Sequence, residues 1–239
     1  MIADFTRREA LGLAKGVALG AMFAQLPHAN AAGERITCFI GQSGFPRSGA
    51  MCLGMLATAR PEAQLHAIAE LRLQTKHRRT LQAGSTDKYA AAFCKAFVDH
   101  MLADKEMRFF ASLVRIGKPP ATPAERDAVM LACHVKTLEE AEARGVAEIY
   151  LLQRDEMHTG ALTAAIRKNA MPSARVGHRK LKDNDLIQLA GFIAAAIRTE
   201  GGKVRRDFRA FLKQRLGVRE LNQASLARHP NFRIREIVV

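Results

Sequence analysis

The pattern of hydrophobic residues predicts an α/β protein, because two adjacent strands come first and helices then alternate with strands. Residues 36–40 are β-branched or apolar, and they are followed by residues that favour turns, Gly41, Gly44 and Pro46. A second apolar run, residues 50–57, follows a loop rich in Gly, Ser and Pro. We therefore expect a β-hairpin at the start of a mixed sheet.

Helical periodicity and apolar runs define the elements after the hairpin. We expect helices at residues 62–75, 87–103, 122–144, 158–168, 185–200 and 204–216, and strands at 107–116, 146–152 and about 174–177. Thr122 and Glu125 have the spacing of a capping box, as do Asp185 and Gln188. The elements alternate, as expected of a sheet flanked by helices.

The chain has 239 residues, of which 48% are hydrophobic, enough for one domain with an ordinary core. No apolar run approaches the roughly 18–20 residues of a membrane span, so we expect none in the mature chain. We divide the chain into a signal segment at residues 1–32, one domain at 33–220 and a tail at 221–239, where no periodicity is evident.

The first residues resemble a twin-arginine export signal. Residues 6–11, Thr-Arg-Arg-Glu-Ala-Leu, precede a weakly hydrophobic stretch at 11–26, and Pro27 ends that stretch. Small residues at 29–31 suit a signal peptidase. The resemblance predicts export to the periplasm or beyond and a mature chain that begins near Ala32. The alternative is an amphipathic helix with two chance arginines.

Positive charge is concentrated in the C-terminal half. The formal net charge is +14, and residues 167–219 contain 14 Lys and Arg against four Asp and Glu. Five of these cations lie close together in the sequence: Arg198, Lys203, Arg205, Arg206 and Arg209. Such a cluster predicts weak, non-specific binding of nucleic acid or another polyanion. The alternative is a solvated face that keeps the protein in solution.

The four cysteines form no metal-binding pattern. Cys38 and Cys52 are symmetric about Phe45, so a hairpin centred there would place them opposite each other. In an oxidising compartment such a pair can form a disulfide, and the alternative is two buried thiols.

Five segments together resemble the bacterial domain-of-unknown-function 3800 family, over roughly residues 35–216. The segments are Phe39–Gly44, Ala69–Arg72, Lys88-Tyr89 with Met107–Val114, Ile149–Gln153, and Leu186–Phe192. They resemble, in order, the family's strand ending in Asp-Glu-Ser-Gly, its Glu-Leu-Lys segment, its helix and strand, its late strand ending in Asp, and its Leu-Gln-Leu-Ala-Asp-Leu helix. The resemblance implies a ribonuclease-H-like fold.

The same resemblance implies where a metal site would lie. In a ribonuclease-H-like site, carboxylates from the first strand, a later strand and the late helix hold one or two divalent cations. The matching positions here are Gly41, Gln42, Gln153 and Gly191, and only Glu70 keeps a carboxylate. Neutral groups cannot replace the lost charge, so we expect no metal and no cofactor. The glycines should leave space for a vestigial cleft.

Two functions from different classes follow. The first is an exported, non-catalytic member of this family that binds nucleic acid or another polyanion through its basic half. The second is a metal-dependent nuclease that uses Mg²⁺ or Mn²⁺ at a rearranged site. That site would draw on Glu70, Asp155, Glu156 and Asp183.

Overall fold

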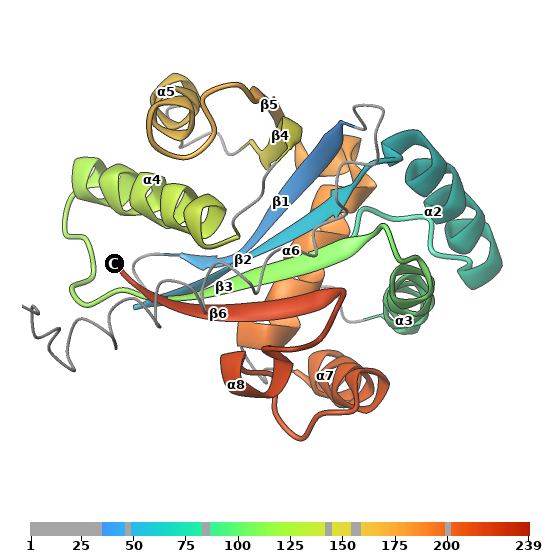
Figure 1. The fold of residues 1–239 in the computed structure, drawn as a ribbon. Coiled ribbons are helices and arrows are strands. Elements are labelled where there is room, and N and C mark those ends of the chain that lie inside the picture. The colour runs from blue at the N-terminus through green and yellow to red at the C-terminus, as the bar shows by residue number, and fades with distance from the viewer. Residues whose placement is uncertain (1–34, 46–48, 83–86, 142–144, 154–158, 199–201) are drawn as a thin grey trace, which may run out of the picture.

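The computed structural model describes residues 35–45, 49–82, 87–141, 145–153, 159–198 and 202–239. Within these residues, six strands form one mixed sheet in the order β5-β4-β1-β2-β3-β6, flanked by seven helices (Figure 1). β1 and β2 form an antiparallel hairpin, so the predicted α/β class and the hairpin at its start are confirmed. This strand order is consistent with a ribonuclease-H-like fold.

The strands are β1 (Ile36–Phe45), β2 (Ala50–Thr58), β3 (Arg108–Arg115), β4 (Val146–Leu152), β5 (Arg175–Arg179) and β6 (Phe232–Val238). The helices are α2 (Pro61–Thr75), α3 (Lys88–Ala103), α4 (Pro123–Glu140), α5 (Thr159–Asn169), α6 (Asp185–Arg198), α7 (Lys203–Leu216) and α8 (Gln223–Leu226). β4 runs parallel to β1 and β5, and β3 pairs antiparallel with β2 and parallel with β6.

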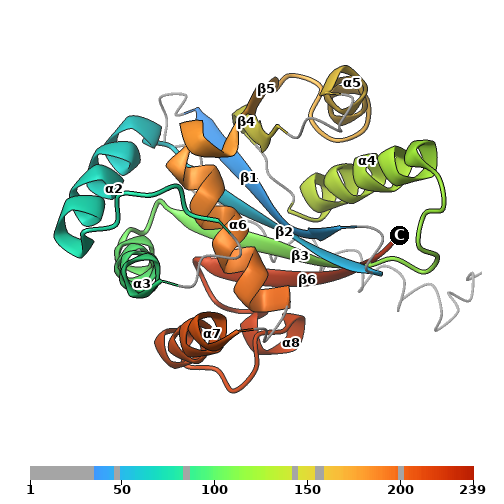
Figure 2. The ribbon, with the colours of Figure 1, turned by 180° about the vertical axis from the view of Figure 1, so that it is seen from behind.

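The helices cover the two faces of the sheet with different sets of elements. α2, α3, α6, α7 and α8 pack on one face, here called the α6 face, and α4 and α5 pack on the other, the α4 face (Figure 1, and from behind in Figure 2). Side chains alternate along β1, so Phe39 joins the core under α6, while Cys38 and Ile40 join the core under α4. The sheet therefore separates two hydrophobic cores.

Local capping explains where two of these helices begin. Thr122 Oγ1 accepts a hydrogen bond from the Glu125 amide at 3.2 Å, and Glu125 Oε2 accepts one from the Thr122 amide, so the first predicted capping box is confirmed. The second is wrong: Asn184 Oδ1 accepts from the Ile187 amide at 3.0 Å and begins α6. An Asx side chain one residue earlier satisfies the exposed amide instead.

Residues 221–239 are not a separate tail, contrary to prediction. β6 pairs with β3 along its whole length, from Phe109 opposite Phe232 to Arg115 opposite Val238. The apolar side chains of Phe232 and Ile234 enter the core under α6. Alternation of apolar and charged residues was the available signal, and it is typical of an edge strand with one buried face.

The predicted signal segment lies outside the described residues. Among those that are described, no helix has both the length and the hydrophobicity to span a membrane.

Candidate functional site

The crossing of β1 and α6 is where the family resemblance predicts an active site. Gly41 lies inside β1 and faces α6, rather than ending the strand as predicted. A Cβ atom added to Gly41 would overlap the amide nitrogen of Gly191 and the carbonyl oxygen of Ile187, and would lie 2.8 Å from the Gly191 Cα. On β2, a Cβ at Gly54 would overlap the carbonyl oxygen of Ala190. The backbone of α6 therefore lies directly on the backbones of β1 and β2.

Two of the four positions expected to carry carboxylates meet at this crossing. Gly191 lies against β1, and a Cβ added to it would be 3.5 Å from the backbone nitrogen and oxygen of Gln42. The first strand and the late helix thus converge, as the resemblance implies, but backbone atoms fill the space between them. The expectation of a vestigial cleft is wrong, because backbone atoms of α6 occupy the space beside Gly41.

The two glutamines lie away from this contact. The Gln42 side chain is on the α4 face, where Nε2 donates to the Gly44 carbonyl oxygen at 3.0 Å and lies 3.7 Å from Met130 Sδ. Gln153 is exposed just after β4, and its backbone N–H donates to the Arg179 carbonyl oxygen at 2.7 Å. The four positions that match the family motif therefore do not form one site.

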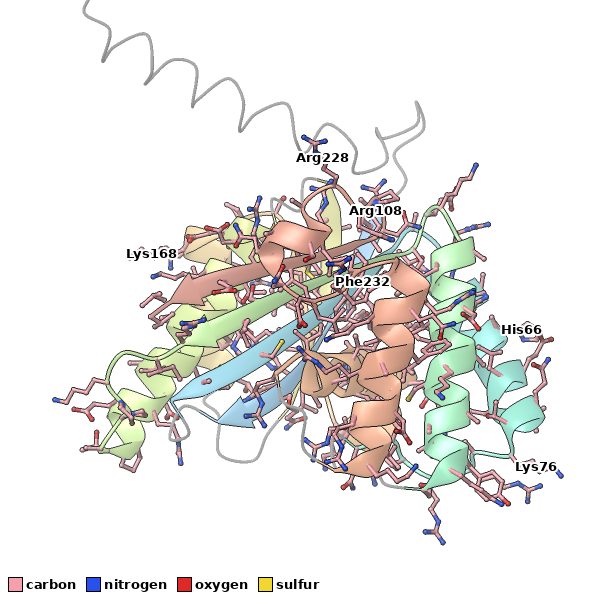
Figure 3. All side chains as sticks on the ribbon, turned by 90° about the horizontal axis from the view of Figure 1, so that it is seen from below. His66, Lys76, Arg108, Lys168, Arg228 and Phe232 are labelled. Atoms are coloured by element: carbon pink, nitrogen blue, oxygen red, sulfur yellow. The ribbon has the colours of Figure 1, made fainter. Side chains whose placement is uncertain are left out.

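The carboxylates of the alternative nuclease site are also dispersed, as far as they can be placed. Glu70 is on α2, 60% exposed, and its Oε1 lies 3.3 Å from His66 Nε2 one turn away. Figure 3 shows His66 at the outside of the molecule, pointing away from the sheet. Asp183 is exposed in the short 3₁₀ turn before α6. Asp155 and Glu156 lie outside the described residues.

Within the described part of the chain, no three His, Cys, Asp or Glu residues are arranged to hold a metal ion. The carboxylate at the start of α6 is already engaged: Arg72 Nε and Nη2 donate to the two oxygens of Asp185 at 2.8 and 2.7 Å. Such a bidentate, partly buried pair is strong and geometrically specific. The sequence matches Arg72 only to a family segment, and nothing in the sequence indicates its pairing with Asp185.

Arg72 and Gln188 together join three segments at this end of α6. Arg72 Nη1 donates to the carbonyl oxygens of His77 and Arg79, at 3.2 and 2.9 Å. Gln188 accepts from the Leu81 amide at 2.7 Å and donates to the Leu181 carbonyl oxygen at 2.8 Å. These contacts hold the backbone of residues 77–81 against α2 and α6, so the cluster is structural.

The predicted basic cluster is divided by its contacts. Arg209 donates to the Ala196 and Ile197 carbonyl oxygens at 2.9 and 2.7 Å, and only 14% of its side chain is exposed. It caps the C-terminal end of α6, where a cation also complements the helix dipole. Lys203 pairs with Asp207 at 2.9 Å, and Arg198 Nε donates to Ser43 Oγ at 3.3 Å.

The two remaining members of the cluster, Arg205 and Arg206, are partly or fully exposed on α7. Other cations of this helix pair with acids, Lys213 with Glu220 at 3.1 Å and Arg215 with Asp99 at 2.6 Å. The net positive surface of α7 is therefore smaller than its sequence suggests.

The hypothesis of a Cys38–Cys52 disulfide is wrong. Cys38 lies opposite Ala57 and Cys52 opposite Ser43, so the two are five residues out of register. They also belong to the cores on opposite faces of the sheet. Both thiols are free, and burial raises the pKa of each to about 12. Phe45 pairs with Ala50, so the hairpin is not centred on Phe45.

No protein-family model matches the chain, and no curated protein matches it. The class of protein is therefore defined by the fold alone: an α/β domain with a mixed six-stranded sheet in a ribonuclease-H-like order. The resemblance to the domain-of-unknown-function 3800 family stays a prediction.

Proposed function

We propose that the protein is a non-catalytic, ribonuclease-H-like protein that is exported and binds nucleic acid or another polyanion. The direct contact between Gly41 and Gly191 carries the first part of this proposal. A two-metal mechanism needs carboxylates around ions that are roughly 3.5–4 Å apart. Two backbones in contact leave room for neither the ions nor their ligands.

The charge of the chain supports the binding function. A formal net charge of +14 attracts phosphate polymers over a distance, and neutralising phosphates releases bound counterions. Arg205 and Arg206 are the members of the predicted cluster that remain for such contacts, with Arg198 at the end of the neighbouring helix. Binding through so few cations is weak, non-specific and steeply dependent on salt.

Binding and cleavage are measured together. The full chain is titrated into labelled single- and double-stranded DNA and RNA across a salt series, with Mg²⁺ or Mn²⁺ present, and the nucleic acid is then run on a gel. We expect binding that weakens with salt, and intact nucleic acid. The double variant Arg205→Gln/Arg206→Gln should reduce the slope of log K against log salt by about 2, whereas Lys168→Gln on α5 should change it little.

Two results would contradict the proposal. Absence of nucleic-acid binding at low salt would show that the basic residues form only a solvated face. Metal-dependent cleavage that is lost in Glu70→Ala or Asp155→Ala would establish the nuclease alternative.

The location outside the cytoplasm rests on the resemblance of the first residues to a twin-arginine signal. N-terminal sequencing of exported protein is expected to begin near Ala32. An intact Met1 on functional cytoplasmic protein would contradict this part of the proposal.

A further inference from the structure

A second group of arginines lies on the α4 face, where β3 meets the edge strand β6. Phe110 and Val114 of β3 pack in the core under α4, so Arg108 and Ser112, two residues from Phe110 on either side, share that face. On β6, Ile237 packs in the same core. By the same alternation, Arg233 and Arg235 project to this face. We call Arg108, Ser112, Arg233 and Arg235 the arginine face.

The parallel register of β3 and β6 places the two β6 arginines in a row beside this face of β3. Arg233 lies opposite Phe110, and Arg235 lies opposite Ser112. Neighbouring strands are about 4.8 Å apart, so long side chains on adjacent pairs reach one another. Arg108 lies at the start of β3, and Figure 3 shows it near Phe232 at the start of β6. On β2 its neighbour is Ala57, which is too short to cover a guanidinium group.

Two polar atoms on this face have no hydrogen-bond partner. They are Nε of Arg108 and Oγ of Ser112, and both atoms are buried. Ser112 is 0% exposed, and a buried hydroxyl or guanidinium N–H without a partner costs free energy that native proteins rarely leave uncompensated. Arg108 and Ser112 are four residues apart on β3 with Phe110 between them, so each atom lacks an acceptor of its own. Ser112 is enclosed in the core, whereas Arg108 is partly exposed and can meet a ligand from solvent.

The charges point to an anionic acceptor rather than to water. Burial lowers the pKa of Arg108, and the positive charge of Arg233 lowers it further. The nearest acid along β6, Glu236, projects from the other face of the strand and pairs with Arg115 at 3.3 Å. An anion beside the Arg108 guanidinium group would supply the acceptor that its Nε lacks and offset the neighbouring positive charge.

We propose that the arginine face binds a phosphate group. A tetrahedral phosphate presents several acceptor oxygens, which suit the Nε–H and Nη–H donors of Arg108 and the guanidinium groups of β6. Because the donors come from two strands rather than from flexible loops, the site is preorganised. It is distinct from the surface of α7 that the proposed function uses.

The test is calorimetric titration of inorganic phosphate into the full chain, in chloride buffer at a pH where phosphate is mostly a dianion. The wild-type chain should bind phosphate at one site. Arg108→Met keeps most of the apolar stem, removes the guanidinium group, and should weaken binding by at least about tenfold, as expected for losing a charge-assisted hydrogen bond. Arg115→Met is the matched control, because Arg115 lies on the other face of the same strand in an exposed ion pair with Glu236, and it should leave the affinity unchanged.

Arg235→Gln is the second test variant, and circular dichroism checks the fold of each protein. If Arg108→Met does not fold, the test rests on Arg235→Gln, which should also weaken phosphate binding. No phosphate binding by the wild-type chain would overturn the inference, as would equal affinity in the folded test variant.

A second arm distinguishes the source of the phosphate. A short single-stranded oligonucleotide that competes with inorganic phosphate would show that the site accepts the phosphates of a polymer, and no competition would show a site for free phosphate or a small phosphate ester. Phosphate binding without any nucleic-acid binding would refute the proposed function and leave this inference intact. The opposite outcome is nucleic-acid binding that depends on Arg205 and Arg206 but not on Arg108, with no binding of inorganic phosphate. That result would overturn this inference and leave the proposed function intact.

Discussion

The two faces of the sheet use arginine in different ways. On the α6 face, Arg72 and Arg209 each donate to acceptors that would otherwise be unsatisfied, the Asp185 carboxylate and the last carbonyls of α6. On the α4 face, Arg108 is half-buried beside Arg233, and its Nε has no acceptor. The first arrangement stabilises the fold and the second weakens it in the absence of a ligand.

This difference shows that the density of positive charge in a sequence is a poor guide to binding. Helix α7 contains six Lys and Arg, but acids or helix carbonyls engage four of them, Lys203, Arg209, Lys213 and Arg215. The arginine face has fewer cations, spread between residues 108 and 235. Stability is commonly sacrificed at sites that bind ligands, so the less stable arrangement is the better candidate.

The largest effect is expected from Gly41→Ala on the α6 face. The added Cβ would overlap backbone atoms of α6, which cannot move aside as a flexible side chain could. We expect a loss of about 3 kcal/mol in the free energy of unfolding, at the upper end for overpacked cores. Urea denaturation measures it. Gly160→Ala is the control, since nothing lies within 4 Å of its Cβ position. Equal stability of the two variants would mean that α6 does not lie on β1.

Arg209→Ala should have the next largest effect. It removes two charge-assisted hydrogen bonds to the Ala196 and Ile197 carbonyl oxygens, and we expect a loss of about 2 kcal/mol. Arg206→Ala, on the exposed side of the same helix, should stay within about 0.5 kcal/mol of the wild-type chain. If Arg209→Ala lost less stability than Arg206→Ala, the arginines of the α6 face would not stabilise the fold as this contrast requires.

Arg108→Met should instead raise the free energy of unfolding. In phosphate-free buffer it removes a half-buried cation from beside Arg233, and we expect a gain of about 1 kcal/mol, or about 2–4 °C in melting temperature. Arg115→Met, on the same strand but in an exposed ion pair with Glu236, should cost at most about 0.5 kcal/mol. A clear destabilisation by Arg108→Met would show that Arg108 supports the fold, as the arginines of the α6 face do.

The smallest effect is expected in the reactivity of two buried thiols, Cys38 on the α4 face and Cys52 on the α6 face. Burial raises the pKa of Cys38 and of Cys52 to about 12, so at pH 8 only about one thiol in ten thousand is ionised. Neither should react with a thiol reagent in the native protein, and both should react once it is unfolded. Rapid reaction of Cys38 alone in the native state would mean that the α4 face opens more readily than the α6 face.

Most of the fold was predictable because it depends on local patterns. The helices and central strands follow apolar periodicities, and the β4 bounds at Val146–Leu152 agree with the prediction. The register of the hairpin was not predictable from symmetry about Phe45, because β1 continues through Gly41 and Gly44. A glycine within a strand has the same sequence signature as a glycine in a turn, and only the helix that packs on it distinguishes them.

The candidate sites were less predictable because they depend on long-range contacts. The lack of carboxylates at Gly41 and Gly191 was evident, but the closure of the space between them required knowing how closely α6 approaches β1. Arg108 and Arg235 are far apart in the sequence, and we had assigned Arg235 to a tail outside the domain. Pairing of β6 with β3 is what places them on one face.

The most direct test of this contrast between the faces is the change in melting temperature caused by inorganic phosphate. A ligand that binds only the folded chain raises its stability in proportion to the logarithm of its concentration. The account predicts that phosphate raises the melting temperature of the wild-type chain and of Arg115→Met by the same amount, and leaves that of Arg108→Met unchanged. An equal rise in all three proteins, or no rise in the wild-type chain, would contradict it.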